Sequence, residues 1–240
     1  MLGLVIGAIL AEIGDPRLVF WVATAASLIA PLFALAVPSM REAARVKAGG
    51  AAFSVPSPMS IWAFCFGFTL DGIFVFGLSL IAKSSVSSGA VLAAGGVLAL
   101  RYLSEMLLSP VSGSLAERFG AMRVMVVLSL ILAALLLVLG LGGGAILIWL
   151  AVVASVLVRA VVQPLPPPVL AELYPGPERV PAMARQATWR DIGAGTGPLA
   201  AGALFPIAPP LAIWAGAALL LTGASLWLRT EDGRRRPPPA

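Results

Sequence analysis

Seven apolar runs, each long enough to cross a lipid bilayer, constrain this chain more than any other feature of its sequence. A helix needs about 20 apolar residues to span the hydrocarbon core of a membrane. The charged fraction is only 11%, whereas a soluble domain typically carries about 25%. The sequence therefore predicts an all-α, polytopic bundle of transmembrane helices. The runs cover residues 18–37, 61–81, 88–111, 121–141, 145–162, 181–205 and 211–228, and a shorter one covers 1–13.

Basic residues gather in alternate connections between these runs. Arginines or lysines follow the first, third, fifth and seventh runs, whereas 140–144 and 205–210 carry no charge and 81–88 carries only Lys83. Because basic connections stay in the cytoplasm, every run then crosses in the alternating sense that a continuous chain requires. This pattern places the C-terminus in the cytoplasm. The heavy use of Ala, Gly, Pro and Arg favours the inner membrane of a bacterium.

Two glycine-containing stretches far apart in the chain share one pattern. Residues 3–11 and 193–202 both have two glycines four positions apart, followed by Ala or Pro, two apolar residues and Ala. Corresponding helices of a transporter with an internal repeat recur in this way, although Gly-xxx-Gly is common enough in membrane helices to arise by chance. In the second stretch we expect a face for close helix packing, formed by Gly193, Gly197, Pro198 and Gly202.

A short basic segment between the third and fourth runs carries a family resemblance. It reads Gly-Ser-Leu-Ala-Glu-Arg-Phe-Gly-Ala-Met-Arg over residues 113–123 and resembles the cytoplasmic loop signature of the major facilitator superfamily. The resemblance implies that its side chains help to hold the cytoplasmic side closed through charge contacts between helices. Simple anchoring by positive charge is the alternative, and it accounts only for the arginines. The signature residues are Gly113, Leu115, Glu117, Arg118, Gly120 and Arg123.

The resemblance covers nearly the whole chain and implies an architecture like that of the superfamily, truncated at its N-terminus within helix 5. Residues 193–202 are similar to the family's helix 11. Residues 3–11 are similar to its helix 5 motif, with Ala8 in place of the usual proline, and this departure weakens any inference of antiport. The implied parts are the end of an N-terminal bundle at 1–37, a cytoplasmic loop at 38–60, a C-terminal six-helix bundle at 61–228 and a basic cytoplasmic tail at 229–240.

Three charged residues in the middle of apolar runs are candidates for a solute or proton site. They are Asp71, Arg101 and Glu105. A charge at the bilayer centre costs about 2.5–3.5 kcal/mol on insertion scales, so each one needs a partner or a function. Arg101 and Glu105 are four residues apart on one helix face and can neutralise each other, or exchange partners with Asp71 on the preceding helix. A purely structural role in helix packing is the alternative.

Other charged residues lie nearer the predicted helix ends. Arg159 is expected to extend its side chain to the membrane interface. Arg190 and Asp191 lie about two turns into the sixth run and are candidates for a cytoplasmic gate, with loop anchoring as the alternative. Because neighbouring residues diverge by about 100° around a helix, Arg190 and Asp191 are expected to have different partners.

These features favour a secondary transporter for a small, unidentified solute, working by alternating access with protons as the coupling ion. The alternative is a non-transporting membrane protein, such as a fragment, a sensor or an assembly partner. An enzyme is disfavoured, because the chain has no histidine, a single cysteine and no phosphate-binding loop. We expect no metal site and no cofactor. The expected partners are the lipid bilayer, the solute and protons, and not nucleic acid.

Overall fold

The computed structural model of the chain describes residues 17, 21, 24, 25, 27, 28, 56–85 and 89–235. The short apolar run at 1–13, with its glycine motif at 3–11, lies outside these residues. Most of the predicted run at 18–37 and most of the predicted loop at 38–60 also lie outside them.

Every regular element within the described residues is a helix, which confirms the predicted all-α bundle. The elements in chain order are α3 (Pro58–Phe66), the π-helix η1 (Gly67–Ile73), α4 (Phe74–Ser85), α5 (Ala90–Phe119), α6 (Ala121–Leu141), α7 (Ala145–Val162), α8 (Pro166–Leu173), the 3₁₀-helix η2 (Gly176–Glu178), α9 (Arg179–Leu204) and α10 (Pro210–Arg235).

Five stretches of helix in the described residues are long and apolar enough to cross a membrane. Each corresponds to one of the predicted runs. The helix α9 also matches a run and has 26 residues, but its four charged residues and lower hydropathy keep it out of this group. The five are Pro58–Ser84, Leu92–Phe119, Ala121–Leu141, Ala145–Leu173 and Pro210–Thr230.

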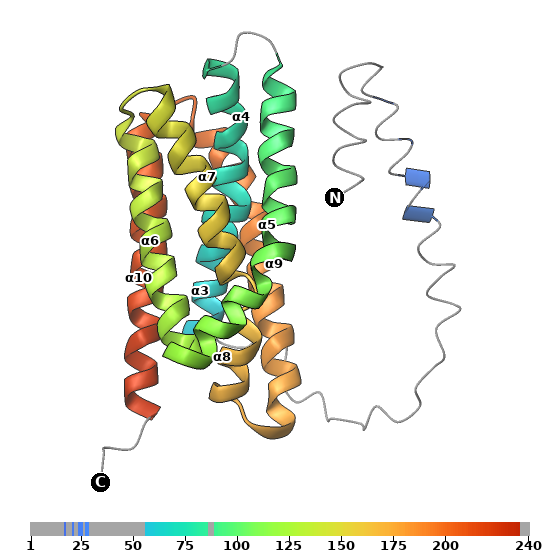
Figure 1. Ribbon diagram of the computed structural model, residues 1–240, viewed down its shortest axis with the longest axis vertical. Coiled ribbons are helices and arrows are strands. Elements are labelled where there is room, and N and C mark those ends of the chain that lie inside the picture. The colour runs from blue at the N-terminus through green and yellow to red at the C-terminus, as the bar shows by residue number, and fades with distance from the viewer. Residues whose placement is uncertain are drawn as a thin grey trace.

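The continuous helix made of α3, η1 and α4 packs against several neighbours. The helices α9 and α10 pack on α3 and η1, while α5 packs on α4. The helix α7 lies against both α5 and α6, and α6 lies against α10. The central helix therefore packs between α5, α9 and α10 (Figure 1), and its one acidic side chain, Asp71, also reaches Arg159 of α7.

The connections between helices lie at two opposite ends of the bundle. Figure 1 shows the α5–α6 turn, η2 and the end of α10 at one end, and the α6–α7 and α9–α10 connections at the other. The first group contains the basic segments and the second contains uncharged ones. A single residue, Gly120, joins α5 to α6, and its φ of +87° is a backbone conformation that glycine adopts without strain.

Three predicted boundaries differ most from the structure. The third run was expected to end at residue 111, but α5 continues to Phe119. The fifth run was expected to end at residue 162, but the chain makes only a short turn at 163–165 and resumes as α8. Proline fits the first turn of a helix because the N–H that it lacks has no partner there. At the C-terminus, α10 continues to Arg235, so residues 229–235 of the predicted tail are helical.

Candidate functional site

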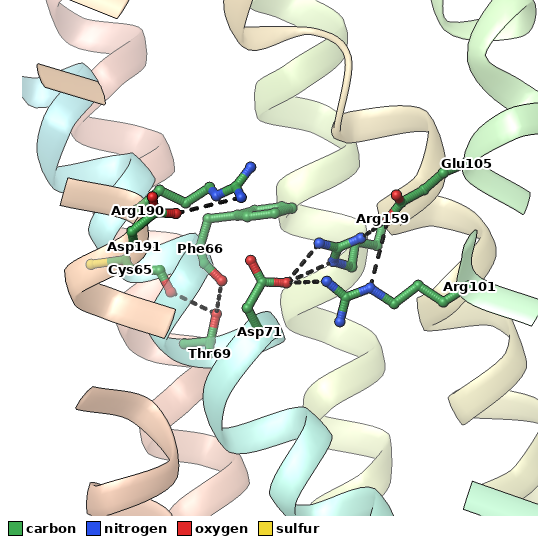
Figure 2. A network of polar contacts seen from close by, with 9 residues as sticks. All are labelled: Cys65, Phe66, Thr69, Asp71, Arg101, Glu105, Arg159, Arg190 and Asp191. Carbon is green, nitrogen blue, oxygen red and sulfur yellow. Dashed lines mark hydrogen bonds and ion pairs between the residues drawn. The ribbon is translucent and has the colours of Figure 1, made fainter. Parts of the chain in front are cut away.

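Four charged side chains from three helices meet inside the bundle. Asp71 comes from η1, Arg101 and Glu105 from α5, and Arg159 from α7 (Figure 2). The Asp71 Oδ1 atom accepts hydrogen bonds from Arg101 Nη2 at 2.6 Å, from Arg159 Nη2 at 2.6 Å and from Arg159 Nε at 3.1 Å. Glu105 accepts a hydrogen bond from Arg159 Nη1. The Asp71 carboxylate thus links α5 to α7.

The charges of this network balance, with two guanidinium groups and two carboxylates. The side chain of Arg159 is 3% exposed, and those of Arg101 and Asp71 are each 11% exposed. Removing ions from water costs several kcal/mol each, and only close partners offset that cost. Arg101 Nε lies 3.6 Å from Glu105 Oε1, an ion pair without a hydrogen bond, and this buried N–H has no hydrogen-bond partner.

A π-helical turn positions Asp71. In η1 the Phe74 N–H binds the carbonyl oxygen of Thr69, five residues back rather than four. Thr69 Oγ1 donates to the carbonyl oxygen of Cys65 at 2.7 Å, so a side chain covers part of the widened turn. Such turns insert one residue into a helix and occur frequently at functional sites. Here the only acidic residue of the central helix lies within that turn.

The backbone of α9 packs directly on η1 through glycines. A Cβ added at Gly197 would lie 2.5 Å from the Phe68 carbonyl oxygen, and one at Gly72 would lie 2.5 Å from the Gly197 Cα. Gly193 is equally tight against the Phe64 carbonyl, while Gly202 has only the Phe76 ring at 3.9 Å. Of the residues expected to form a packing face, Gly193 and Gly197 thus touch backbone, and Pro198 lies beside Gly72.

The loop-signature residues are placed at the α5–α6 turn. Glu117, Arg118 and Arg123 are exposed, and within the described residues none of them forms an ion pair with another helix. Arg118 instead lies over the neighbouring Phe119 ring, 5.2 Å from its centroid. Of the remaining signature residues, Gly113 and Leu115 lie within the last turns of α5, open and half-buried respectively, and Gly120 forms the turn.

The expectation that Arg190 and Asp191 have different partners is wrong. Arg190 Nη2 lies 3.5 Å from Asp191 Oδ1, so the two neighbours on α9 form a loose ion pair with each other. Asp191 is 70% exposed and Arg190 is 35% exposed. The Cα–Cβ bonds of neighbouring helix residues diverge by about 100°. The arginine side chain is long enough to reach its neighbour despite this divergence, so the angle between positions alone does not predict the partner.

Arg159 is the residue that the sequence interpretation missed. It does not extend to an interface but lies buried against Asp71 and Glu105. Its helix was expected to end at residue 162, which put Arg159 one turn from the end. Because the apolar span continues to Leu173, Arg159 lies in the middle of it. The available signal was the charge count in the middle of the other runs: two acids, Asp71 and Glu105, against the single arginine Arg101, which leaves one acid without a partner.

The fold and the buried charges define a multi-pass helical membrane protein with an ion network inside its bundle. The family model for the Major Facilitator Superfamily matches residues 59–240, three quarters of the chain. The chain therefore belongs to the Major Facilitator Superfamily, as the loop signature indicated. No curated protein and no solved structure matches it significantly.

Proposed function

We propose that this chain belongs to a secondary transporter that moves a small solute by alternating access, with protons as the coupling ion. The observation that carries the proposal is the balanced network of Asp71, Arg101, Glu105 and Arg159, which joins three helices inside the bundle. Buried ionisable residues within membrane spans commonly mark proton relays and solute pathways. Membership of the superfamily supports the transporter class.

Proton binding at Asp71 would unbalance the network. Asp71 accepts hydrogen bonds from both arginines, so its neutralisation leaves two buried cations beside the one remaining carboxylate, that of Glu105. Buried charge without a partner costs several kcal/mol, and the arginines must then find new partners or water. Because the arginines belong to α5 and α7, this rearrangement moves helices relative to η1. The proton thereby biases the bundle between its two states.

The proposed transporter also has a defined orientation in the membrane and a gate at its cytoplasmic end. The basic end of the bundle faces the cytoplasm, together with the C-terminus. The loop signature at 113–123 and the Arg190–Asp191 pair lie toward that end and form contacts that hold it closed in one state. The membrane is the inner membrane of a bacterium. The family match supports a transporter rather than a sensor.

The substitution Asp71→Asn tests the proposal. It removes the proton site but keeps the shape of the side chain, so uphill accumulation of the solute should fall to the level of empty vesicles. Solute exchange without a gradient should persist, because it needs no net proton movement. The solute is first identified by an uptake and efflux screen in cells, and accumulation is then measured in proteoliposomes with an imposed proton gradient.

The matched control is Glu172→Gln, which removes an exposed carboxyl group on α8, outside the network. It should leave accumulation unchanged. Undiminished accumulation in Asp71→Asn would refute proton coupling through this residue. A wild-type protein that moves none of the screened solutes, in either direction, would favour a non-transporting role.

A further inference from the structure

A cavity separate from the charge network lies between α3, the α7–α8 turn and α9. Its volume is about 220 Å³, below the range of about 300–1,000 Å³ typical of sites for drug-sized ligands. The side chains of Gln163, Gln186 and Arg190 supply its polar surface. The cavity is therefore large enough for a small metabolite but not for a drug-sized ligand.

Arg190 is the only charged group that lines this cavity. Its Nε–H is buried and has no hydrogen-bond partner, and its only ionic contact in the described residues is the loose pair with the exposed Asp191. By contrast, Arg101 and Arg159 are held by Asp71 and Glu105. Arg190 thus has one buried donor, Nε–H, without a hydrogen-bond partner, and a bound anion would satisfy it.

Apart from these polar side chains, the cavity is lined by aromatic rings and prolines. Trp62 and Phe66 stack with their ring centroids 4.9 Å apart and line the cavity beside two prolines at the start of α8. The Trp62 N–H is already donated to Ser129 Oγ at 3.2 Å, so this side chain lines the cavity with its ring rather than with a donor. Both rings are only 1% exposed, so a hydrocarbon or aromatic ligand would gain by removing its own apolar area from water.

The Phe66 ring also separates this cavity from the charge network. The Phe66 side chain lines the cavity, and the guanidinium carbon of Arg159 lies 5.8 Å from the centroid of its ring. Figure 2 shows the ring between Arg190 and Arg159. A ligand held by Arg190 would therefore be one aromatic side chain away from the proton-binding network.

We infer that this cavity is a binding site for a small organic carboxylate, with the carboxylate on Arg190 and its apolar body on Trp62 and Phe66. The planar guanidinium fork matches the two oxygens of a carboxylate. One loosely paired cation balances a monoanion, whereas a dianionic phosphate would leave a charge uncompensated. The amides of Gln163 and Gln186 can donate to the remaining lone pairs. Calling this ligand the transported solute rests on the proposed function; the binding itself does not.

Isothermal titration of the purified full chain in detergent tests this site, with benzoate as the probe and benzamide as its neutral isostere. We expect saturable benzoate binding with a Kd of about 1 mM or tighter, and no saturable binding of benzamide. Arg190→Gln should weaken benzoate binding about tenfold or more, because a charge-assisted pair is lost. The matched control Arg185→Gln removes the same charge from α9 outside the cavity and should bind benzoate like the wild type.

A second variant keeps the test decisive if Arg190→Gln does not fold. Gln186→Glu preserves the shape of the side chain but adds a negative charge to the cavity wall, so it should abolish benzoate binding. Absence of benzoate binding to the wild type would overturn the inference. So would loss of binding in Arg101→Gln with retention in Arg190→Gln, because the anion would then occupy the charge network.

The benzoate titration and the transport assay test the carboxylate site and the proposed function independently. The titration uses no membrane gradient, so Arg190-dependent binding in a protein that moves no solute would count against transport alone. Proton-coupled transport in a protein that binds no benzoate would count against the carboxylate site alone.

Discussion

At the scale of single residues, the buried network behaves as one unit whose members compensate one another. Asp71 satisfies two arginines, and Arg159 satisfies two carboxylates. Removing one member leaves an uncompensated charge in a site where water is scarce. Removing one cation together with one anion keeps the net charge of the network at zero. Replacing such a pair should therefore lower the stability of the fold less than replacing either member alone.

A double-mutant cycle on Asp71 and Arg159 follows from this balance. Arg159→Met should destabilise the protein by about 3–5 kcal/mol, because Asp71 and Glu105 then share one arginine. Asp71→Asn combined with Arg159→Met should recover part of that loss. Thermal unfolding in detergent is followed with a thiol-reactive dye, since the only cysteine, Cys65, is buried and reacts on unfolding.

The control for the cycle is Arg123→Met, which removes an exposed arginine from α6 and should change the unfolding temperature little. Strictly additive losses in the double variant would mean that the two residues do not interact.

At the scale of helices, contact between α9 and η1 depends on the lack of side chains at a few positions. Gly72 and Gly197 meet backbone to backbone, and Gly193 meets the carbonyl of Phe64. Without a hydrophobic drive between helices in lipid, such close contacts supply much of the packing energy. The same contacts fix η1, and with it the position of Asp71.

Gly197→Ala should therefore loosen this interface and lower stability by about 1–3 kcal/mol, because the added methyl would lie 2.5 Å from the Phe68 carbonyl oxygen. Gly195→Ala is its matched control on the same helix, since a Cβ there meets nothing within 4 Å. The control should be neutral or slightly stabilising. Equal unfolding temperatures for the two variants would show that α9 does not pack on η1 as described.

At the scale of the whole molecule, the bundle separates its charged connections from its uncharged ones. The α5–α6 turn and η2 lie at one end, and the α9–α10 connection lies at the other (Figure 1). In the proposed orientation, the first end lies in the cytoplasm because it carries the basic residues. This orientation would also set the side from which the Arg190 cavity and the loop signature are reached.

Cysteine labelling in intact cells measures the orientation. In a Cys65→Ala background, Ile207→Cys should react with a membrane-impermeant maleimide added outside. Glu178→Cys should react only after the membrane is permeabilised, because it lies at the basic end. Both positions are exposed in the structure, so unequal labelling reflects the side of the membrane. Labelling of both positions from the same side would contradict the topology.

Local pattern in the sequence was enough to predict most of the long helices in the described residues, and two of them were predicted to the residue. Residues 121–141 and 145–162 coincide with α6 and α7, because uninterrupted apolar runs end at glycines or prolines. The pairing of Asp71 with Arg101 was also anticipated as an alternative, since adjacent helices tend to pack together. These inferences needed only composition, period and neighbours in the chain.

Long-range contacts were beyond that reasoning. Arg159 pairs with Asp71 across 88 positions, and no local period encodes which faces of α7 and the central helix meet. The prolines after residue 162 suggested a stop, whereas the turn is brief and α8 prolongs the apolar span. The π-helix was missed for a related reason, because its sequence, Gly-Phe-Thr-Leu-Asp-Gly-Ile, has no feature that separates it from an α-helix.

The widened turn at η1 has a consequence for how the central helix can be altered. It carries one more residue than an α-helical stretch of the same height. Deleting one residue between 67 and 73 would let this segment rewind as an α-helix of about the same height, so α3 and α4 would keep nearly the same rotation relative to each other. Such a deletion would remove the widened turn while leaving the flanking helices in register, and it would separate the contribution of that turn to the position of Asp71 from theirs.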